Sequence, residues 1–256
     1  MVTMMQLQTM TSTAPRGYSL PPAWDNQRRT NPDWVGLREV MTLMQFDGQA
    51  GVVDDERLFR RCRVKAGQTV FDSGQSFDGL YVVRLGALKS VVTHDDGAEH
   101  VLSFAMKGDL LGTEGVCANR YRTEAVALTD SEVIRLPASE LFSPGHASND
   151  IERMAYWAIS RELVKEQMSY TLTHAVRSDV RVARFLLLQS DCFAAIGCSP
   201  RRLTLPMTRR DIGNYLNITL ETVSRALSAL HQLGVIDVSH REVVINSHEA
   251  LRAYEG

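Results

Sequence analysis

Residues 208–234 read TRRDIGNYLNITLETVSRALSALHQLG, and this stretch decides the fold of the C-terminal part of the chain. Thr208 suits the N-cap of a helix, and Asp211 three residues later completes a capping box. Asn217 tolerates the left-handed backbone that ends a helix, so a tight turn is expected there. Thr219 then caps a second helix, which a glycine terminates. Two short helices joined by a tight turn predict a helix-turn-helix.

The second helix has one apolar face with the spacing i, i+3, i+4 and i+7, formed by Val223, Ala226, Leu227 and Leu230. A hairpin is predicted directly after this helix. There, the β-prone runs VIDV and EVVI flank a polar turn of Ser239, His240 and Arg241. Together with a further helix at 178–195, these elements predict a winged helix-turn-helix domain over residues 178–256.

Three polar residues of the second helix are expected to face outward together. Glu221, Ser224 and Arg225 lie at i, i+3 and i+4, near the end that a recognition helix points at DNA bases. Arginine can donate two hydrogen bonds to guanine, glutamate can accept one from cytosine, and serine can bond to several base edges. Each residue alone could equally belong to a solvated surface, and the helix dipole alone favours Glu221. Their shared position favours base readout.

The charge distribution agrees with a small DNA-reading module. The formal net charge of the chain is −2, from 28 basic and 30 acidic residues. Residues 178–256 hold nine arginines and eight acids, a balance of +1 against −3 elsewhere. Polar side chains around the two helices could contact phosphates, which position a protein on DNA without specifying sequence. The expected phosphate contacts are Arg201, Arg202, Thr208, Arg209, Arg210, Thr219 and Thr222. An arginine-rich solvated surface is the alternative.

The sequence from about residue 62 to residue 141 has a different texture. Short β-prone runs alternate with glycines, and Asp96-Gly97 is a strong hairpin signal. Many short strands at this spacing predict an antiparallel β-roll, or jelly roll, assigned to residues 33–147 as a sensor domain. Residues 1–32 are rich in Thr, Ser, Pro, Gln and Asn, which predicts a flexible tail.

Residues 148–177 are predicted to form a dimerisation helix. Residues 148–176 contain no Gly or Pro and would make a helix of about 40 Å, longer than a small domain needs. Pairing with a second copy would bury its seven-residue apolar track. The predicted dimer contacts are Met154, Ala158, Arg161, Met168 and Leu172. The alternative is that the apolar face packs on the β-roll. The whole chain is thus expected to be an α+β protein.

Other function classes have weaker support in the sequence. The four cysteines, Cys62, Cys117, Cys192 and Cys198, form no CxxC pair, so no zinc site is expected and their roles stay open. The H-x-H set of a cupin-like enzyme is absent from the sequence, and no catalytic-triad motif is suggested, so we expect no enzyme. A regulatory module without DNA contact is a second rival. Without a long apolar run or a secretory signal, the cytoplasm is the expected location.

The segment TRRDIGNYLNITLETVSRALSALHQLGVI resembles the DNA-binding segment of the Crp/Fnr regulators. Upstream, KAGQTVF, GLYVVRLGALKS, MKGDLLG and SEVIRLP resemble the β-roll sensor domain of that family. The resemblance covers about residues 55–256, and its helix-turn-helix part is very specific. The face E-x-x-S-R is similar to the signature of the Fnr and FixK branch.

This resemblance implies a homodimer that binds a palindromic operator of the form TTGAT-N4-ATCAA and recruits RNA polymerase. By resemblance, Glu221 meets a cytosine, Arg225 a guanine and Ser224 a thymine. Membership of this branch further suggests control of genes for low-oxygen or nitrogen-oxide respiration.

The chain departs from the family at both of the family's cofactor sites. The Fnr iron–sulfur cluster needs four cysteines, but none precedes Cys62, and Ile134 stands at the matching internal position, so we expect no such cluster. Crp-type regulators bind cyclic AMP through a G-E-L turn and an R-S-A triplet. Here GDL at 108–110 and RTE at 122–124 would place a carboxylate near the phosphate, which disfavours nucleotide binding. No cofactor is therefore expected, with a cyclic-nucleotide-responsive Crp-like regulator as the alternative.

Overall fold

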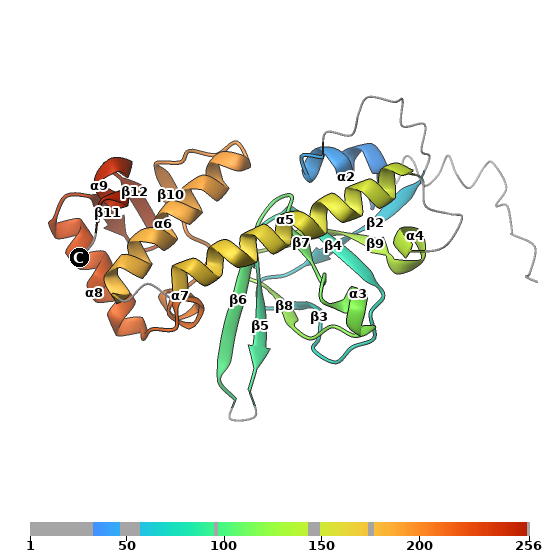
Figure 1. Cartoon of the computed structure of the whole chain (residues 1–256), viewed down its shortest axis with the longest axis horizontal. Helices are drawn as coiled ribbons and strands as arrows, with labels where there is room; N and C mark the ends of the chain where they lie inside the picture. Colours follow the sequence, from blue (N-terminus) through green and yellow to red (C-terminus); the bar gives the residue numbers. More distant parts are fainter. Residues whose placement is uncertain (1–32, 47–56, 95–96, 143–148, 174–176, 255–256) are drawn as a thin grey trace, which may run out of the picture.

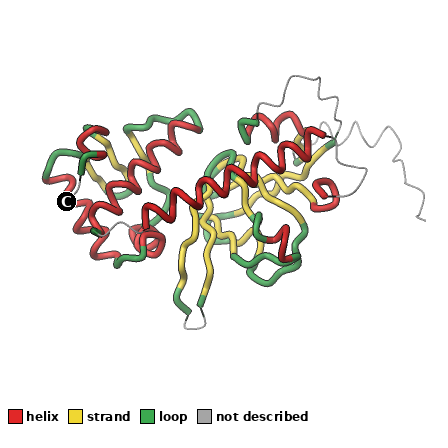
Figure 2. Tube along the Cα trace, viewed as in Figure 1, coloured by secondary structure: helices red, strands yellow, loops and turns green. Residues whose placement is uncertain are grey.

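The computed structural model describes residues 33–46, 57–94, 97–142, 149–173 and 177–254. A β-rich part and a part made of short helices lie at the two ends of one long helix (Figure 1). Figure 2 shows the same division as yellow strands on one side and mostly red helices on the other. This mixture confirms the expected α+β class. The predicted flexible tail lies outside the described residues.

Two antiparallel sheets form the β-roll. Its strands are β1 (Trp34–Gly36), β2 (Leu58–Val64), β3 (Thr69–Phe71), β4 (Gly79–Leu85), β5 (Leu88–Thr93), β6 (Glu99–Ala105), β7 (Leu110–Leu111), β8 (Glu124–Ala127) and β9 (Ser131–Pro137). The strand orders are β1-β2-β9-β4-β7 and β3-β8-β5-β6. Three short helices accompany them: α2 (Leu37–Leu43), α3 (Gly115–Ala118) and α4 (Ala138–Phe142). The hairpin signal at Asp96-Gly97 falls between β5 and β6, which pair antiparallel; Asp96 itself is not described.

The long helix α5 (Asn149–Thr173) packs one face against the β-roll of its own chain. Met154 is 1 % exposed and Ala158 is 0 % exposed, in an apolar cluster with Leu80 and Ile134. The prediction that Met154 and Ala158 contact a second copy is therefore wrong. A seven-residue track shows that one helix face is apolar, but it cannot show whether the same chain or another chain covers that face.

Arg161 also serves the fold of its own chain. It donates hydrogen bonds to the backbone oxygens of Met44, at the end of α2, and of Gly108. Its guanidinium carbon lies 4.8 Å from the centre of the Trp157 ring. These contacts fix α5 against the β-roll of its own chain, and the dimer contact of the half-buried Arg161 stays a prediction.

Other positions of α5 carry exposed apolar side chains. Met168, one of the predicted dimer contacts, is 60 % exposed and lies two heptads after the buried Met154, near the C-terminal end of the helix. The exposed apolar residues of α5 are Tyr156, Leu163, Val164 and Met168, which we call the α5 stripe. The side chain of Leu172 lies outside the described part of the structure. Exposed apolar side chains gathered on one helix are typical of interaction sites.

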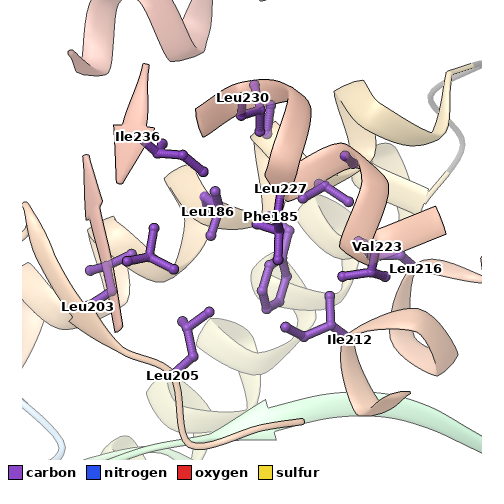
Figure 3. Packing of buried hydrophobic residues seen from close by; sticks show 14 of the residues in the cluster. Phe185, Leu186, Leu203, Leu205, Ile212, Leu216, Val223, Leu227, Leu230 and Ile236 are labelled. Carbon is purple, nitrogen blue, oxygen red and sulfur yellow. The ribbon is translucent and has the colours of Figure 1, made fainter. Parts of the chain in front are cut away.

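The C-terminal part is a winged helix-turn-helix. Its elements are α6 (Ser178–Ala195), β10 (Arg202–Thr204), α7 (Arg209–Leu216), α8 (Leu220–Gln232), β11 (Ile236–Ser239), β12 (Glu242–Ile245) and α9 (His248–Arg252). Figure 3 shows Phe185 of α6 surrounded by apolar side chains that include Ile212 of α7 and Leu227 of α8. The wing turn is shorter than expected, because Ser239 pairs with Glu242 and leaves only two residues between the strands.

The helices in the described ranges include none that is both long enough and apolar enough to cross a bilayer.

Gly213 lets α7 and α8 approach closely at their turn. A β-carbon added there would lie 2.7 Å from the backbone oxygen of Ile218, closer than such atoms can approach. Gly213→Ala should therefore force backbone shifts and destabilise the winged domain by roughly 1–3 kcal/mol. Urea unfolding measures this loss. Gly36→Ala is the control, since a β-carbon on Gly36 has nothing within 4 Å in the described structure. Equal effects of the two changes would contradict the assignment.

Candidate nucleic-acid interface

Hydrogen bonds at the helix starts set the directions of α7 and α8. Thr208 Oγ1 accepts from the backbone N–H of Asp211 at 3.1 Å, and Asp211 Oδ2 accepts from the backbone N–H of Thr208 at 2.9 Å. This confirms the predicted capping box. Asn217 ends α7 in the left-handed conformation, with φ of 54°, as its residue type indicates. Thr219 Oγ1 caps α8 by accepting from the backbone N–H of Thr222 at 3.2 Å.

The apolar face of α8 is buried inside the winged domain. The four residues predicted for this face are all 4 % exposed or less: Val223, Ala226, Leu227 and Leu230. Because these side chains point into the core, the other side of α8 faces outward. Glu221 and Arg225 are exposed and Ser224 is half-buried, all within the first two turns. The structure therefore brings the three predicted base-reading residues onto one accessible surface, which we call the α8 face.

Glu221 stays ionised on the α8 face. The pKa of Glu221 lies below its ordinary value, first because the carboxylate accepts from its own backbone N–H at the helix start. A hydrogen bond from Thr219 and the nearby charges of Arg225 and Arg210 lower this pKa further. An ionised carboxylate can only accept hydrogen bonds. Close to phosphates it would be repelled, so a base amino group is the partner that suits it.

Arginines surround the α8 face. Arg201, Arg202 and Arg210 are exposed, and Arg209 is half-buried. Among the described carboxylates, none lies within 4.0 Å of these four side chains or of Arg225. Their positive charge is therefore available to an anion. The residues predicted as phosphate contacts thus lie on the two helices and on the strand beside them.

The predicted phosphate contact by Thr208 has a structural obstacle. Its hydroxyl donates to Asp211 Oδ2 at 2.6 Å, and its backbone N–H donates to the same oxygen. Both donors of Thr208 are therefore engaged, although the residue is exposed. Thr219 and Thr222 share a hydrogen bond between their hydroxyls at 3.0 Å, and either hydroxyl may act as the donor. Thr219 also donates to the Glu221 carboxylate, so the hydroxyl hydrogens of this pair are engaged within α8.

Sequence reasoning missed the wing as part of this surface. A hollow of about 500 Å³ lies between α7 and the wing, with Thr208, Arg209, His240 and Arg241 among its lining residues. Pairing of β10 with β12 puts the wing turn beside the start of α7. In the sequence, the only sign of this contribution was a basic residue, Arg241, in the predicted hairpin turn. Only long-range strand pairing shows that this tip lies next to the helix-turn-helix.

The β-roll residues matched to a cyclic-nucleotide site are engaged within the chain. Asp109 pairs with Lys165 of α5 and accepts from the backbone N–H of Met106 at 2.9 Å. The hydroxyl of Thr123 donates to Glu114 Oε1 at 2.7 Å, so this hydroxyl is engaged by a carboxylate. Arg122 is exposed. These residues do not fit an anionic nucleotide.

Aromatic side chains fill the interior of the β-roll. The rings of Phe71 and Tyr121 stack with centroids 4.0 Å apart, and Tyr81 lies beside them. Asp78 accepts hydrogen bonds from the hydroxyls of Tyr81 at 3.0 Å and Tyr121 at 2.6 Å. Burial, followed by the charge of Asp78, raises the pKa of Tyr81 to about 12, so this hydroxyl remains a neutral donor. Ile134, at the matched cluster-ligand position, is 0 % exposed in the neighbouring apolar core.

The fold and the α8 face together define a winged-helix DNA-binding regulator attached to a β-roll. Residues 180–254 match the Crp-like helix-turn-helix domain, and residues 61–143 match the cyclic nucleotide-binding domain. The chain belongs to the Crp/Fnr family of DNA-binding transcription regulators and is not an enzyme.

Known proteins of this family cover most of the chain. It is 37 % identical to the transcriptional regulatory protein btr of Bordetella pertussis, over 74 % of this chain and 78 % of that protein. It is 31 % identical to the fumarate and nitrate reduction regulatory protein of Escherichia coli, over 79 % of this chain and 81 % of that protein. The solved structure of FixK2 from Bradyrhizobium japonicum superposes with a TM-score of 0.68 at 28 % identity, covering 77 % of this chain and 98 % of that one.

The N-cap of α8 is a testable source of stability for the α8 face. Thr219→Ala removes the acceptor for the backbone N–H of Thr222 and should destabilise the winged domain by about 1 kcal/mol. Urea unfolding of the full chain measures the change. Thr204→Ala, on the exposed side of β10, is the matched control. If the Thr219→Ala protein is as stable as this control, the cap does not stabilise the winged domain.

Proposed function

We propose that two copies of the chain bind a palindrome of the form TTGAT-N4-ATCAA, each through its α8 face. The observation that carries this proposal is the shared outward position of Glu221, Ser224 and Arg225 at the start of a helix whose other side is buried. In the Fnr and FixK branch that the sequence resembles, the matching residues meet cytosine, thymine and guanine respectively. Arg201, Arg202, Arg209 and Arg210 contact phosphates around them.

The α5 stripe supplies the dimer contact. Tyr156 and Leu163 are seven residues apart and share one track along the helix, and Val164 and Met168, four residues apart, lie on a neighbouring track. The predicted pairing through α5 is retained in this proposal, but through the exposed α5 stripe and not through the buried Met154 and Ala158. A two-fold axis along α5 would present two α8 faces to two half-sites.

The signal for this regulator is proposed to be its own abundance and not a bound ligand. The engaged Thr123–Glu114 pair and the aromatic interior of the β-roll support this view over the cyclic-nucleotide alternative. The absence of cysteines before Cys62 supports it over an Fnr-type cluster. Named relatives that regulate fumarate and nitrate reduction support a role in low-oxygen or nitrogen-oxide respiration, exerted in the cytoplasm through contact with RNA polymerase.

Two arginine variants separate base readout from phosphate contact. Arg225→Ala should cost about 1–3 kcal/mol for each guanine contact and reduce the preference for the palindrome. Arg209→Ala should weaken binding to palindromic and scrambled DNA alike and reduce the salt dependence by about one charge per copy. Fluorescence anisotropy at several stated salt concentrations measures both effects. The role assignment fails if both changes act equally on the two DNAs.

A charge in the α5 stripe tests the dimer. Leu163→Glu places a carboxylate where the second copy should pack, so sedimentation velocity should show a monomer with weakened palindrome binding. Leu102→Glu, on the exposed side of β6, makes the same chemical change away from the stripe and should leave a dimer. A Leu163→Glu protein that still sediments as a dimer contradicts the proposed interface.

A further inference from the structure

The β5–β6 hairpin of the β-roll packs into the DNA-binding domain. Val91 and Val101 are each 1 % exposed and belong to the same apolar cluster as the buried side chains of α6, α7 and α8. The ring of Phe104 lies 5.2 Å from that of Tyr215 and 6.1 Å from that of Phe185, between centroids. Figure 1 shows β6 reaching α7. The β5–β6 hairpin of the β-roll therefore contributes side chains to the core of the winged domain.

A buried ion pair lies inside this contact. Lys89 Nζ of β5 is 2.9 Å from Asp211 Oδ1 of α7 and 2.8 Å from Glu99 Oε2 of β6. Lys89 is 9 % exposed and Asp211 is 7 % exposed. Asp211 is also the capping-box residue of α7, and its second oxygen accepts from Thr208. The same carboxylate thus starts the first helix of the helix-turn-helix and binds the β-roll.

Both members of this pair remain charged. Burial alone would lower the pKa of Lys89, but hydrogen bonds to Glu99 and Asp211 raise it above its ordinary value. Burial alone would raise the pKa of Asp211, but its bonds from Thr208 and Lys89 lower it. A buried charge without its partner is strongly unfavourable. In the observed orientation of the two parts of the chain, both buried charges have their partners.

The contact between the β5–β6 hairpin and α7 fixes where α8 lies relative to the β-roll and α5. Rotation of the winged domain relative to α5 would move α8, which carries the base-reading residues. In a dimer, such rotation changes the distance between the two α8 faces, and operator half-site spacing follows that distance.

We propose that Lys89 is a positioning residue for DNA binding. By holding Asp211, it fixes the winged helix-turn-helix relative to the β-roll and α5, and so sets the half-site spacing that the dimer accepts. Lys89 touches no DNA in this proposal; it acts through the start of α7. The inference rests on the proposed palindrome-binding homodimer.

The test compares Lys89→Met with Lys107→Met in the full chain. Methionine keeps much of the side-chain volume and removes the ammonium group, and Lys107 is an exposed lysine of the same domain. Dissociation constants are measured for palindromes with spacers of two to six base pairs and for a single half-site. Lys89→Met should weaken binding to the four-base-pair spacing roughly tenfold and bring the affinities for the other spacings closer to it. Half-site affinity should stay within about twofold, as for Lys107→Met.

A double-mutant cycle with Asp211→Asn assigns the effect to the ion pair. Asparagine keeps a side-chain oxygen for the capping bond with Thr208 but lacks the charge. If the effect of Lys89 depends on Asp211, the double variant should bind the palindrome no more weakly than the weaker-binding of the two single variants. Full additivity of the two losses would overturn the proposal.

Three further results would overturn the inference, and they can be told apart. A parallel loss on half-site and palindrome means that Lys89 serves only the stability of the domain, which overturns the inference. Unchanged or tighter palindrome binding by Lys89→Met, with its spacing preference kept, also overturns it. If the unmodified chain itself shows no preference for the palindrome, the proposed function fails, and the inference that rests on it fails too.

Discussion

The apolar cluster around Phe185 is the constraint on which the rest of the structure depends. Phe185 is 0 % exposed, and α6, α7, α8, the wing and the β5–β6 hairpin all contribute side chains to the same cluster. Removing one such aromatic side chain typically costs about 3–5 kcal/mol. Because Val223 and Leu227 must point into this cluster, Glu221 and Arg225 must point out of it. The accessible α8 face is thus a consequence of how the core is packed.

The β-roll is bound to the DNA-binding part by the same core. Phe104 packs between Phe185 and Tyr215, and Lys89 is buried against Asp211. Phe71, Tyr81 and Tyr121 are buried together inside the β-roll. The β-roll contacts both α5 and the helix-turn-helix. It holds α5 on one side and the helix-turn-helix on the other.

The helix α5 shows how far sequence reasoning reaches. Its length and its apolar track are visible in the sequence, and the helix is present. Yet Met154 and Ala158 face the β-roll, and Arg161 donates to backbone oxygens of Met44 and Gly108. Helical periodicity identifies which side chains share a face but carries no information about what covers it. The exposed Leu163 and Val164, which the sequence prediction did not include, could be recognised only after the covered face was known.

The sequence by itself determined the helix-turn-helix, because its signals are local. The Thr208–Asp211 capping box, the left-handed Asn217 and the Thr219 cap each involve residues no more than three positions apart or a single backbone conformation. Only the tertiary structure decided the pairing of Lys89 with Asp211, 122 residues away, and the position of the wing beside Arg209. Contacts at that separation depend on strand pairing and on the burial of whole faces. A linear pattern does not record them, since many different partners could satisfy the same charge or the same apolar surface.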